Sequence, residues 1–392
     1  MGDVQYMSFP VEEYQMRCNK ARELMEGKEL KGLLITGDSN FAYFTGGKRD
    51  ATMHARPSPM IFPCKGDPTA IVQGFHHWYK AREIWFDDVR GYNTMLGLPL
   101  EMTVEAMQAK GMDKGRVGVE LGYEQRLGIS FNDFMKLKKA LPKVEFVDAA
   151  DLLWSIRMIK SSEEIARIRR ACEITTVAYD SLFPTLSEGM SEREIIDRFF
   201  KLVVNLGGRS PWGLINSGPE NYNSNVGGPG NRRIQRGDQV WLDGGCSYKA
   251  YVSDFCCAGT VAPPSNKQKK MQQMVWEITK AVIDAACPGM RACDIDALNQ
   301  VEWEKRGYNY NRDINWGGGR IGHGVGFAPS ENEPPHIAPY DTTIIKPGMV
   351  FTIEPGINTE YGCYQRESVC LMTEDGLEIL NKIDPALRTI PI

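Results

Sequence analysis

The chain has 392 residues, of which 42% are hydrophobic and 24% charged, a composition that suits folded domains and excludes a disordered protein. The net charge is −4 and the isoelectric point about 5.9, so no basic field favours nucleic acid or an acidic membrane as a partner. At roughly 100–200 residues per domain, the length predicts two domains.

The first residues, MGDVQYMSFPVEEYQ, contain neither a basic stretch nor an apolar core, which argues against a signal peptide. No window of the sequence approaches the roughly 18 apolar residues of a membrane span. Ten cysteines are spread along the chain without a CxxC pair, which excludes zinc-ribbon and thioredoxin-like sites. We therefore expect a cytoplasmic protein whose thiols are reduced.

The first part of the chain alternates helical and strand-like segments. Residues 11–30 are charged and periodic, as in a helix, and the apolar run GLLIT ends at a predicted turn, Gly37-Asp38-Ser39-Asn40. The runs PMIFP and TAIVQ suit a hairpin, and RVGVE and VEFV are further strands. This alternation predicts a layered α/β domain over residues 1–155.

The second part, residues 156–392, has a different pattern. Ser161 and Glu164 have the spacing of a capping box at the start of a long amphipathic helix. Strand-like runs follow: QVWLDGG, YVSDFCCAGTV, MVFTIEPG and ESVCLMT, with a helix predicted between the second and the third. Mostly antiparallel strands joined by short turns predict an α+β fold for this domain.

Asp243 and Asp254 flank a predicted turn within two apolar strands. A hairpin of this length can place both carboxylates on one face. Two like charges in an apolar sheet are costly unless a cation lies between them, which points to a metal site. The alternative is a pair of surface aspartates on successive strands.

Three more candidate ligands occur further along the chain. His323 is surrounded by six glycines between Gly317 and Gly326, a context that packing explains poorly. Glu354 follows an apolar strand, and Glu367 precedes another. Four carboxylates and one imidazole suit hard or borderline divalent ions such as Mn, Co, Zn or Fe.

With these residues in the motifs WLDGGCSYKAYVSD, IGHGVG, KPGMVFTIEPG and YQRESV, the chain resembles the pita-bread superfamily of methionine aminopeptidase, aminopeptidase P, prolidase and creatinase. GLLITGDSNFAYFTGG is similar to the start of the N-terminal domain in creatinase and prolidase. The resemblance covers nearly the whole chain. It implies a C-terminal pita-bread fold behind an N-terminal creatinase-type α/β domain.

The resemblance also implies roles for the five residues. Asp243 would bind one metal ion, Asp254 and Glu367 would bridge two, and His323 and Glu354 would complete the second site. A water bridging two cations would become hydroxide near neutral pH. The resemblance further implies a homodimer in which an N-terminal loop with His54 and Arg56 closes the partner's substrate site. The alternative is that this loop is simply solvated.

The sequence departs from the peptidases of this superfamily at positions around the site. Asn225 and Ser330 stand where the peptidases have histidines that bind the scissile carbonyl, and losing such a donor costs on the order of 3 kcal/mol of transition-state binding. Asn225, Ser330, Glu331 and His336 are therefore the candidate catalytic residues. For His336 the alternative is a residue of an exposed loop.

Trp212 and Trp316 occur beside the predicted site loops, and their aromatic faces could bind a cationic substrate. The alternative is that they are ordinary core tryptophans. We expect a dinuclear metal-dependent hydrolase of the Xaa-Pro peptidase or prolidase type, acting on an amide or C–N bond of a small substrate. One alternative is a lyase or hydrolase of a small zwitterion, similar to dimethylsulfoniopropionate lyase or creatinase. Another is a non-catalytic pita-bread binding module.

Overall fold

The computed structural model describes residues 8–47, 56–74, 77, 81–223, 227–314, 319–327 and 332–392. Contacts between residues divide the chain into two compact units, Met1–Arg157 and Met158–Ile392. Each unit is described by itself below. Within the described residues, no helix is both long and apolar enough to span a bilayer.

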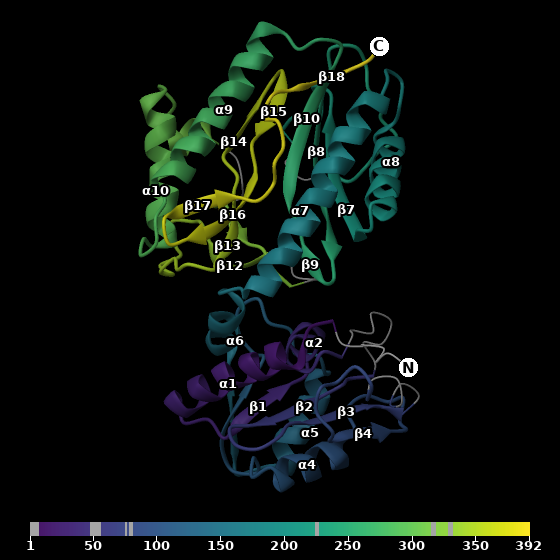
Figure 1. Ribbon diagram of the computed structural model, residues 1–392, viewed down its shortest axis with the longest axis vertical. Coiled ribbons are helices and arrows are strands. Elements are labelled where there is room, and N and C mark those ends of the chain that lie inside the picture. Colours follow the sequence, from purple (N-terminus) through teal and green to yellow (C-terminus); the bar gives the residue numbers. More distant parts are fainter. Residues whose placement is uncertain are drawn as a thin grey trace. The chain divides into compact units, whose positions relative to one another are not determined.

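The N-terminal unit contains one sheet whose strand order is β4-β3-β2-β1-β5-β6. Helices α4 and α5 cover one face of it, where Leu34, Val117, Met107 and Phe134 share a core. Helix α1 packs against α2 and α6 on the opposite side (Figure 1). Its elements are α1 (Val11–Gly27), β1 (Gly32–Ile35), α2 (Asp38–Thr45), β2 (Met60–Pro63), β3 (Thr69–Gln73), β4 (Val89–Tyr92), α4 (Leu100–Ala109), β5 (Gly115–Val119), α5 (Phe131–Ala140), β6 (Val144–Asp148) and α6 (Ala150–Arg157).

The turn predicted at residues 37–40 is wrong, because helix α2 begins there. The cause is a distant carboxylate. Glu120 is 1% exposed and accepts hydrogen bonds from the backbone N–H groups of Thr36 and Gly37, at 2.7 and 2.6 Å, and from Asn40 Nδ2 at 2.7 Å. A negative charge at a helix N-terminus satisfies amides that have no partner within the helix.

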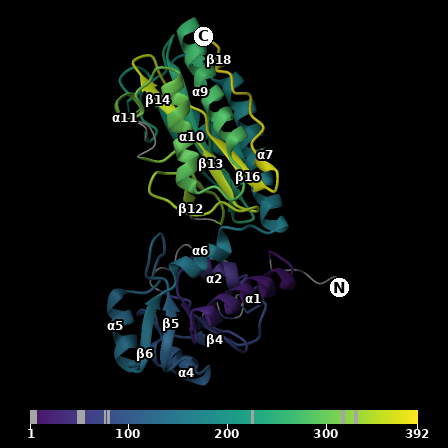
Figure 2. The ribbon, with the colours of Figure 1, turned by 90° about the vertical axis from the view of Figure 1, so that its left-hand side faces the viewer.

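The C-terminal unit contains two five-stranded sheets and a two-stranded ribbon, β14-β15. The first sheet has the order β18-β10-β8-β7, with β9 beside β8, and the second has the order β12-β11-β13-β16-β17. Helices α7 and α8 cover the first sheet, and α9 and α10 pair on the outer side of the second (Figure 2). Two sheets between layers of helices agree with the predicted pita-bread architecture.

The strands and helices of this unit have the following bounds: α7 (Ser162–Leu182), α8 (Glu192–Asn205), β7 (Arg209–Ser217), β8 (Gln239–Tyr248), β9 (Tyr251–Val252), β10 (Phe255–Val261), α9 (Asn266–Ala285), α10 (Ala292–Lys305), α11 (Tyr310–Asp313), β11 (His323–Gly324), β12 (Glu333–His336), β13 (Val350–Ile353), β14 (Gly356–Thr359), β15 (Gly362–Gln365), β16 (Ser368–Thr373), β17 (Gly376–Ile379) and β18 (Arg388–Ile390).

Local sequence signals explain where several of these elements begin. Ser161 and Glu164 form the predicted capping box of α7, with both reciprocal hydrogen bonds present. Strand β8 turns back into β9 through Lys249 and Ala250, whose φ values are +47° and +70°. This predicted hairpin continues as the antiparallel pairing of β8 with β10, in which Asp243 lies opposite Cys256.

Candidate metal centre

The five predicted ligand residues come from five different positions on the two sheets of the C-terminal unit. Asp243 lies within β8 and Asp254 directly precedes β10, both in the first sheet. His323 starts β11, Glu354 follows β13, and Glu367 precedes β16, all in or next to the second sheet. The two sheets of this unit thus bring side chains that are distant in the sequence close together.

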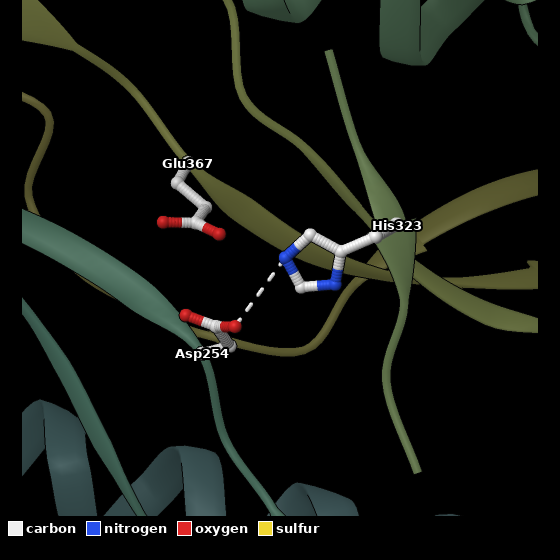
Figure 3. A group of neighbouring side chains, drawn as sticks. All are labelled: Asp254, His323 and Glu367. Carbon is white, nitrogen blue, oxygen red and sulfur yellow. Dashed lines mark ion pairs between the residues drawn. The ribbon is translucent and has the colours of Figure 1, made fainter. Parts of the chain in front are cut away.

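Asp254, His323 and Glu367 each offer a ligand atom, and these three atoms lie within 4.8 Å of one another (Figure 3). The Nε2 atom of His323 is 3.4 Å from Asp254 Oδ2 and 3.9 Å from Glu354 Oε1. All three residues of the group are at most 4% exposed. The carboxylates and the imidazole are therefore shielded from bulk water.

Asp243 and Glu354 add two further carboxyl groups to this set. Burial raises the pKa of Asp243, and a hydrogen bond with the Glu367 carboxyl opposes that shift. The pKa of Glu367 is raised well above its usual range by burial and by the charges of Asp243, Asp254 and Glu354. Burial likewise raises the pKa of Glu354, with Asp243 adding to the shift. These carboxyl groups lie close to one another, and a cation between them would offset their mutual repulsion.

His323 is held as a neutral imidazole. Burial, followed by the positive charge of Arg320, lowers its pKa to about 3. A neutral ring has an unprotonated nitrogen, which is the form that binds a metal ion. Its Nδ1 lies 3.1 Å from the carbonyl oxygen of Gly324. A proton on Nδ1 would be donated to that carbonyl, which leaves Nε2 facing Asp254 and Glu354 as the electron-pair donor.

These residues fit divalent metal ions. Among the described residues, neither Asp243 Oδ1 nor Glu367 Oε2 has a hydrogen-bond partner, although both atoms are buried. Buried carboxylate oxygens without partners are costly in a protein interior. Oxygen ligands with a single imidazole are the donors that manganese, iron, cobalt and zinc accept. The donor set and its unpartnered oxygens thus match the divalent cations that the sequence led us to expect.

Two further predicted site residues lie near this group. His336 pairs with His323 across β11 and β12 and is 2% exposed, so the alternative of an exposed loop residue is wrong. Its Nδ1 is 3.1 Å from Arg320 Nη1. Trp212 lies on β7 opposite Gly245 of β8, and Gly245 is two residues along β8 from Asp243. Side chains two apart on a strand share a face, so the Trp212 ring is on the face of Asp243.

One of the remaining predicted residues lies in the N-terminal unit, and five lie outside the described residues. Arg56 belongs to the N-terminal unit and is partly exposed. The other candidates lie outside the described residues: His54, Asn225, Trp316, Ser330 and Glu331.

Sequence reasoning missed residues that contact the candidate ligands. Gln365 Nε2 donates to Glu354 Oε2 at 2.9 Å. The hydroxyl of Thr352 accepts from the backbone N–H of His323 at 3.1 Å and lies 3.5 Å from Glu354 Oε1. The one available signal was position in the strand pattern, since Thr352 is two residues before Glu354 and Gln365 two before Glu367. Polar residues at such positions in buried strands require partners.

Both parts of the chain match models of known protein families. Residues 166–374 match the model of metallopeptidase family M24, and residues 17–159 match the creatinase/prolidase N-terminal domain. The Xaa-Pro dipeptidase of Pyrococcus horikoshii is 33% identical over 298 residues, which are 73% of this chain and 81% of that protein. The Xaa-Pro dipeptidase of Pyrococcus furiosus is 34% identical over 68% of this chain and 75% of its own length.

Solved structures agree in fold over almost the full length. The prolidase from Pyrococcus horikoshii OT3 aligns with a TM-score of 0.80 at 27% identity, covering 94% of this chain and 99% of that one. A dipeptidase from the same organism aligns with a TM-score of 0.84 at 25% identity, covering 96% and 100%.

The fold and the family matches define a metal-dependent hydrolase. The chain belongs to metallopeptidase family M24, and its N-terminal part is a creatinase/prolidase N-terminal domain.

Proposed function

We propose that this chain is a dipeptidase that hydrolyses the peptide bond before proline, using two divalent metal ions held by Asp243, Asp254, His323, Glu354 and Glu367. The observation that carries the proposal is the convergence of these residues from two sheets, with the buried Asp254, His323 and Glu367 offering ligand atoms within 4.8 Å of one another. The two Pyrococcus relatives at 33% and 34% identity are both Xaa-Pro dipeptidases.

Bound divalent cations supply Lewis-acid polarisation of a carbonyl and lower the pKa of water toward neutrality. The residues of the chain prepare the site for this chemistry. Burial keeps His323 neutral, and Asp254 and Glu367 are almost fully buried beside it. In such a shielded site, electrostatic stabilisation of a developing negative charge is stronger than in water.

The partly exposed side chains around the centre suit substrate binding. The buried indole N–H of Trp212 has no hydrogen-bond partner among the described residues, and the ring shares a face with Asp243. The Arg320 guanidinium lies beside His336 and also donates to Asn332. We assign substrate binding to Trp212 and proton transfer or carbonyl binding to His336. The roles of Asn225, Ser330, Glu331, Trp316, His54 and Arg56, and the homodimer, remain predictions from the sequence.

The identity of the metals is part of the proposal. Oxygen donors with one imidazole accept manganese, cobalt, zinc and iron. The order of affinity among these ions follows the general preference of such ligands and not a feature of this chain. The dipeptidase relatives favour peptide hydrolysis over lyase chemistry on a zwitterion and over a non-catalytic module.

A panel of dipeptides tests the function. Protein loaded with Mn²⁺ or Co²⁺ is incubated with Xaa-Pro dipeptides and with the matching Xaa-Ala dipeptides, and released amino acids are measured. We expect turnover of Xaa-Pro substrates, low turnover of Xaa-Ala, and complete loss of turnover in Asp254→Ala. Metal-loaded protein that hydrolyses none of the Xaa-Pro dipeptides overturns the proposed activity.

A further inference from the structure

We propose that Gln365 is a positioning residue that orients the candidate metal ligand Glu354, and that Trp241 fixes the direction of the Gln365 amide. This inference rests on the proposed metal-dependent function, because it concerns how one ligand of that centre is held.

Gln365 is 3% exposed at the end of β15, and both ends of its amide are engaged. The indole N–H of Trp241 donates to Gln365 Oε1 at 3.1 Å. On the other side, Gln365 Nε2 donates to Glu354 Oε2 at 2.9 Å. A buried chain of two hydrogen bonds therefore runs from the first sheet to the carboxylate of Glu354.

The chemistry of the indole determines which way the amide faces. An indole nitrogen can only donate a hydrogen bond, so the amide oxygen must face Trp241. The NH₂ group then faces Glu354, where a hydrogen bond to a carboxylate is stronger than one between neutral groups. The reversed amide would place its oxygen against Glu354 and its NH₂ group against the indole N–H, so both contacts would become repulsive.

The rest of the Glu354 carboxylate is directed toward the metal centre. With Oε2 bound to Gln365, the other oxygen, Oε1, is the one that lies 3.9 Å from His323 Nε2. The hydroxyl of Thr352 is 3.5 Å from the same Oε1. One carboxylate oxygen is thus anchored by the protein, and the other faces the imidazole. Partners of this kind orient ligand carboxylates and raise the affinity of a site for its metal.

A regular register between β8 and the segment from Cys363 to Glu367 places Gln365 beside Trp241. Gln239 Nε2 donates to the carbonyl oxygen of Cys363 at 2.8 Å, and the backbone N–H of Cys363 donates to Gln239 Oε1 at 2.6 Å. Trp241 and Gln365 are separated by the same 124 positions as Gln239 and Cys363.

Asp243 and Glu367, two of the candidate ligands, continue this spacing of 124 positions. Alternate residues of β8 therefore meet alternate residues of the segment from Cys363 to Glu367. The contact of Trp241 with Gln365 lies one step from a contact between two candidate ligands. A change at Gln365 is for this reason expected to alter the metal centre rather than a remote part of the core.

Calorimetric titration of metal-free protein with Mn²⁺ tests the inference. Gln365→Met keeps the length and removes both hydrogen bonds, so we expect Mn²⁺ affinity to fall roughly 10- to 100-fold, the usual effect of losing such a partner. The matched control is Gln272→Met, because Gln272 is also buried and donates to a backbone oxygen, that of Pro385, away from the ligand residues. The control is expected to bind Mn²⁺ like the natural chain.

A second variant keeps the test decisive if Gln365→Met does not fold. Trp241→Phe leaves the ring but removes the donor that sets the amide direction, so we expect a smaller loss of Mn²⁺ affinity. In the double variant Gln365→Met, Trp241→Phe, the Trp241→Phe change should cause no further loss of Mn²⁺ affinity, because both residues act through one chain of hydrogen bonds. The absorption spectrum of bound Co²⁺ is a further readout, and it should change in both single variants and not in Gln272→Met.

The outcomes separate the inference from the function on which it rests. A natural chain that binds no Mn²⁺ overturns the proposed metal-dependent function. A natural chain that binds Mn²⁺, together with a folded Gln365→Met variant of equal affinity and an unchanged Co²⁺ spectrum, overturns the role of Gln365 alone.

Discussion

His323 Nε2 lies 3.4 Å from Asp254 Oδ2, and the two residues belong to different sheets of the C-terminal unit. The same imidazole nitrogen is 3.9 Å from Glu354 Oε1. Ions bound among these atoms would connect the two sheets. Metal binding should therefore be measurable as a gain in the stability of the folded chain.

We predict that Mn²⁺ raises the melting temperature of metal-free protein and that Asp254→Asn abolishes most of the increase. A ligand at 100 times its dissociation constant stabilises the folded state by about 2.7 kcal/mol. Differential scanning fluorimetry with EDTA and with Mn²⁺ measures the shift. Asp88→Asn in the N-terminal unit is the control for loss of an aspartate, and it should keep the full shift. An equal shift in Asp254→Asn contradicts the assignment of Asp254.

Lys160 and Glu333 form a buried ion pair, with Nζ and Oε2 3.3 Å apart and both side chains 1% exposed. Glu333 Oε1 also accepts from the backbone N–H of Phe327 at 3.1 Å. Lys160→Met removes the ammonium from this carboxylate, and breaking a buried pair in this way costs about 3–5 kcal/mol.

Urea unfolding of the natural chain and of two variants measures this effect. The double variant Lys160→Met, Glu333→Gln should recover a large part of the lost stability, because the glutamine oxygen can still accept from Phe327 and carries no charge. If Lys160→Met has the stability of the natural chain, the pair does not contribute as predicted.

Asp296 on α10 predicts a pH dependence of stability outside the metal centre. The side chain is 1% exposed, its Oδ1 has no partner among the described residues, and burial raises its pKa to about 6 from the usual 3.8. Between these two values the folded chain binds more protons than the unfolded chain at this residue. The contribution of Asp296 to stability therefore falls as the pH rises through that window.

Asp296→Asn removes the ionisation. We expect the variant to exceed the natural chain in free energy of unfolding by on the order of 2 kcal/mol at about pH 7, with the difference disappearing below about pH 4. Urea titrations at several pH values in the presence of EDTA measure the difference while keeping metal out of the comparison. A difference that is constant with pH would argue against a raised pKa.

Trp212 should affect substrate binding through its indole N–H. A Cβ atom at Gly245 would lie 2.9 Å from Trp212 Nε1, so the glycine leaves room for the ring edge on the face of Asp243. For Trp212→Phe we expect KM to rise about 2- to 10-fold, the value of one hydrogen bond, with little change in kcat. Steady-state kinetics with an Xaa-Pro dipeptide measures both constants.

Trp303→Phe is the matched control for this variant. Its indole N–H is also buried without a partner among the described residues, but the side chain is 0% exposed in a core with α9. KM should not change in this control. An unchanged KM in Trp212→Phe as well rules out a hydrogen bond from this residue to the substrate.

The pattern of strands and turns was sufficient to predict much of the C-terminal fold. Asp243 and Asp254 were assigned to one hairpin because glycines and a turn separate two apolar runs, and β8 and β10 form that hairpin. Glu354 directly follows the apolar strand β13, as the sequence predicted. These features depend on neighbours in the sequence, which a single sequence displays.

Features that depend on distant contacts were not predictable in this way. The start of α2 depends on Glu120, more than 80 positions away, so the local sequence resembled a turn. His336 is buried because β12 pairs with β11, and the roles of Gln365 and Trp241 follow from a register between segments separated by 124 positions. In each case the deciding partner comes from another part of the fold, and no local pattern reports it.

Counting the metal ions bound per chain tests the central claim most directly. Metal-free protein is dialysed to equilibrium against Mn²⁺, and bound metal is measured by inductively coupled plasma mass spectrometry, for the natural chain and for Glu367→Gln. The account predicts two ions per natural chain and a clear loss in the variant. A correctly folded natural chain that retains no Mn²⁺, or a Glu367→Gln variant that binds as much as the natural chain, would contradict it.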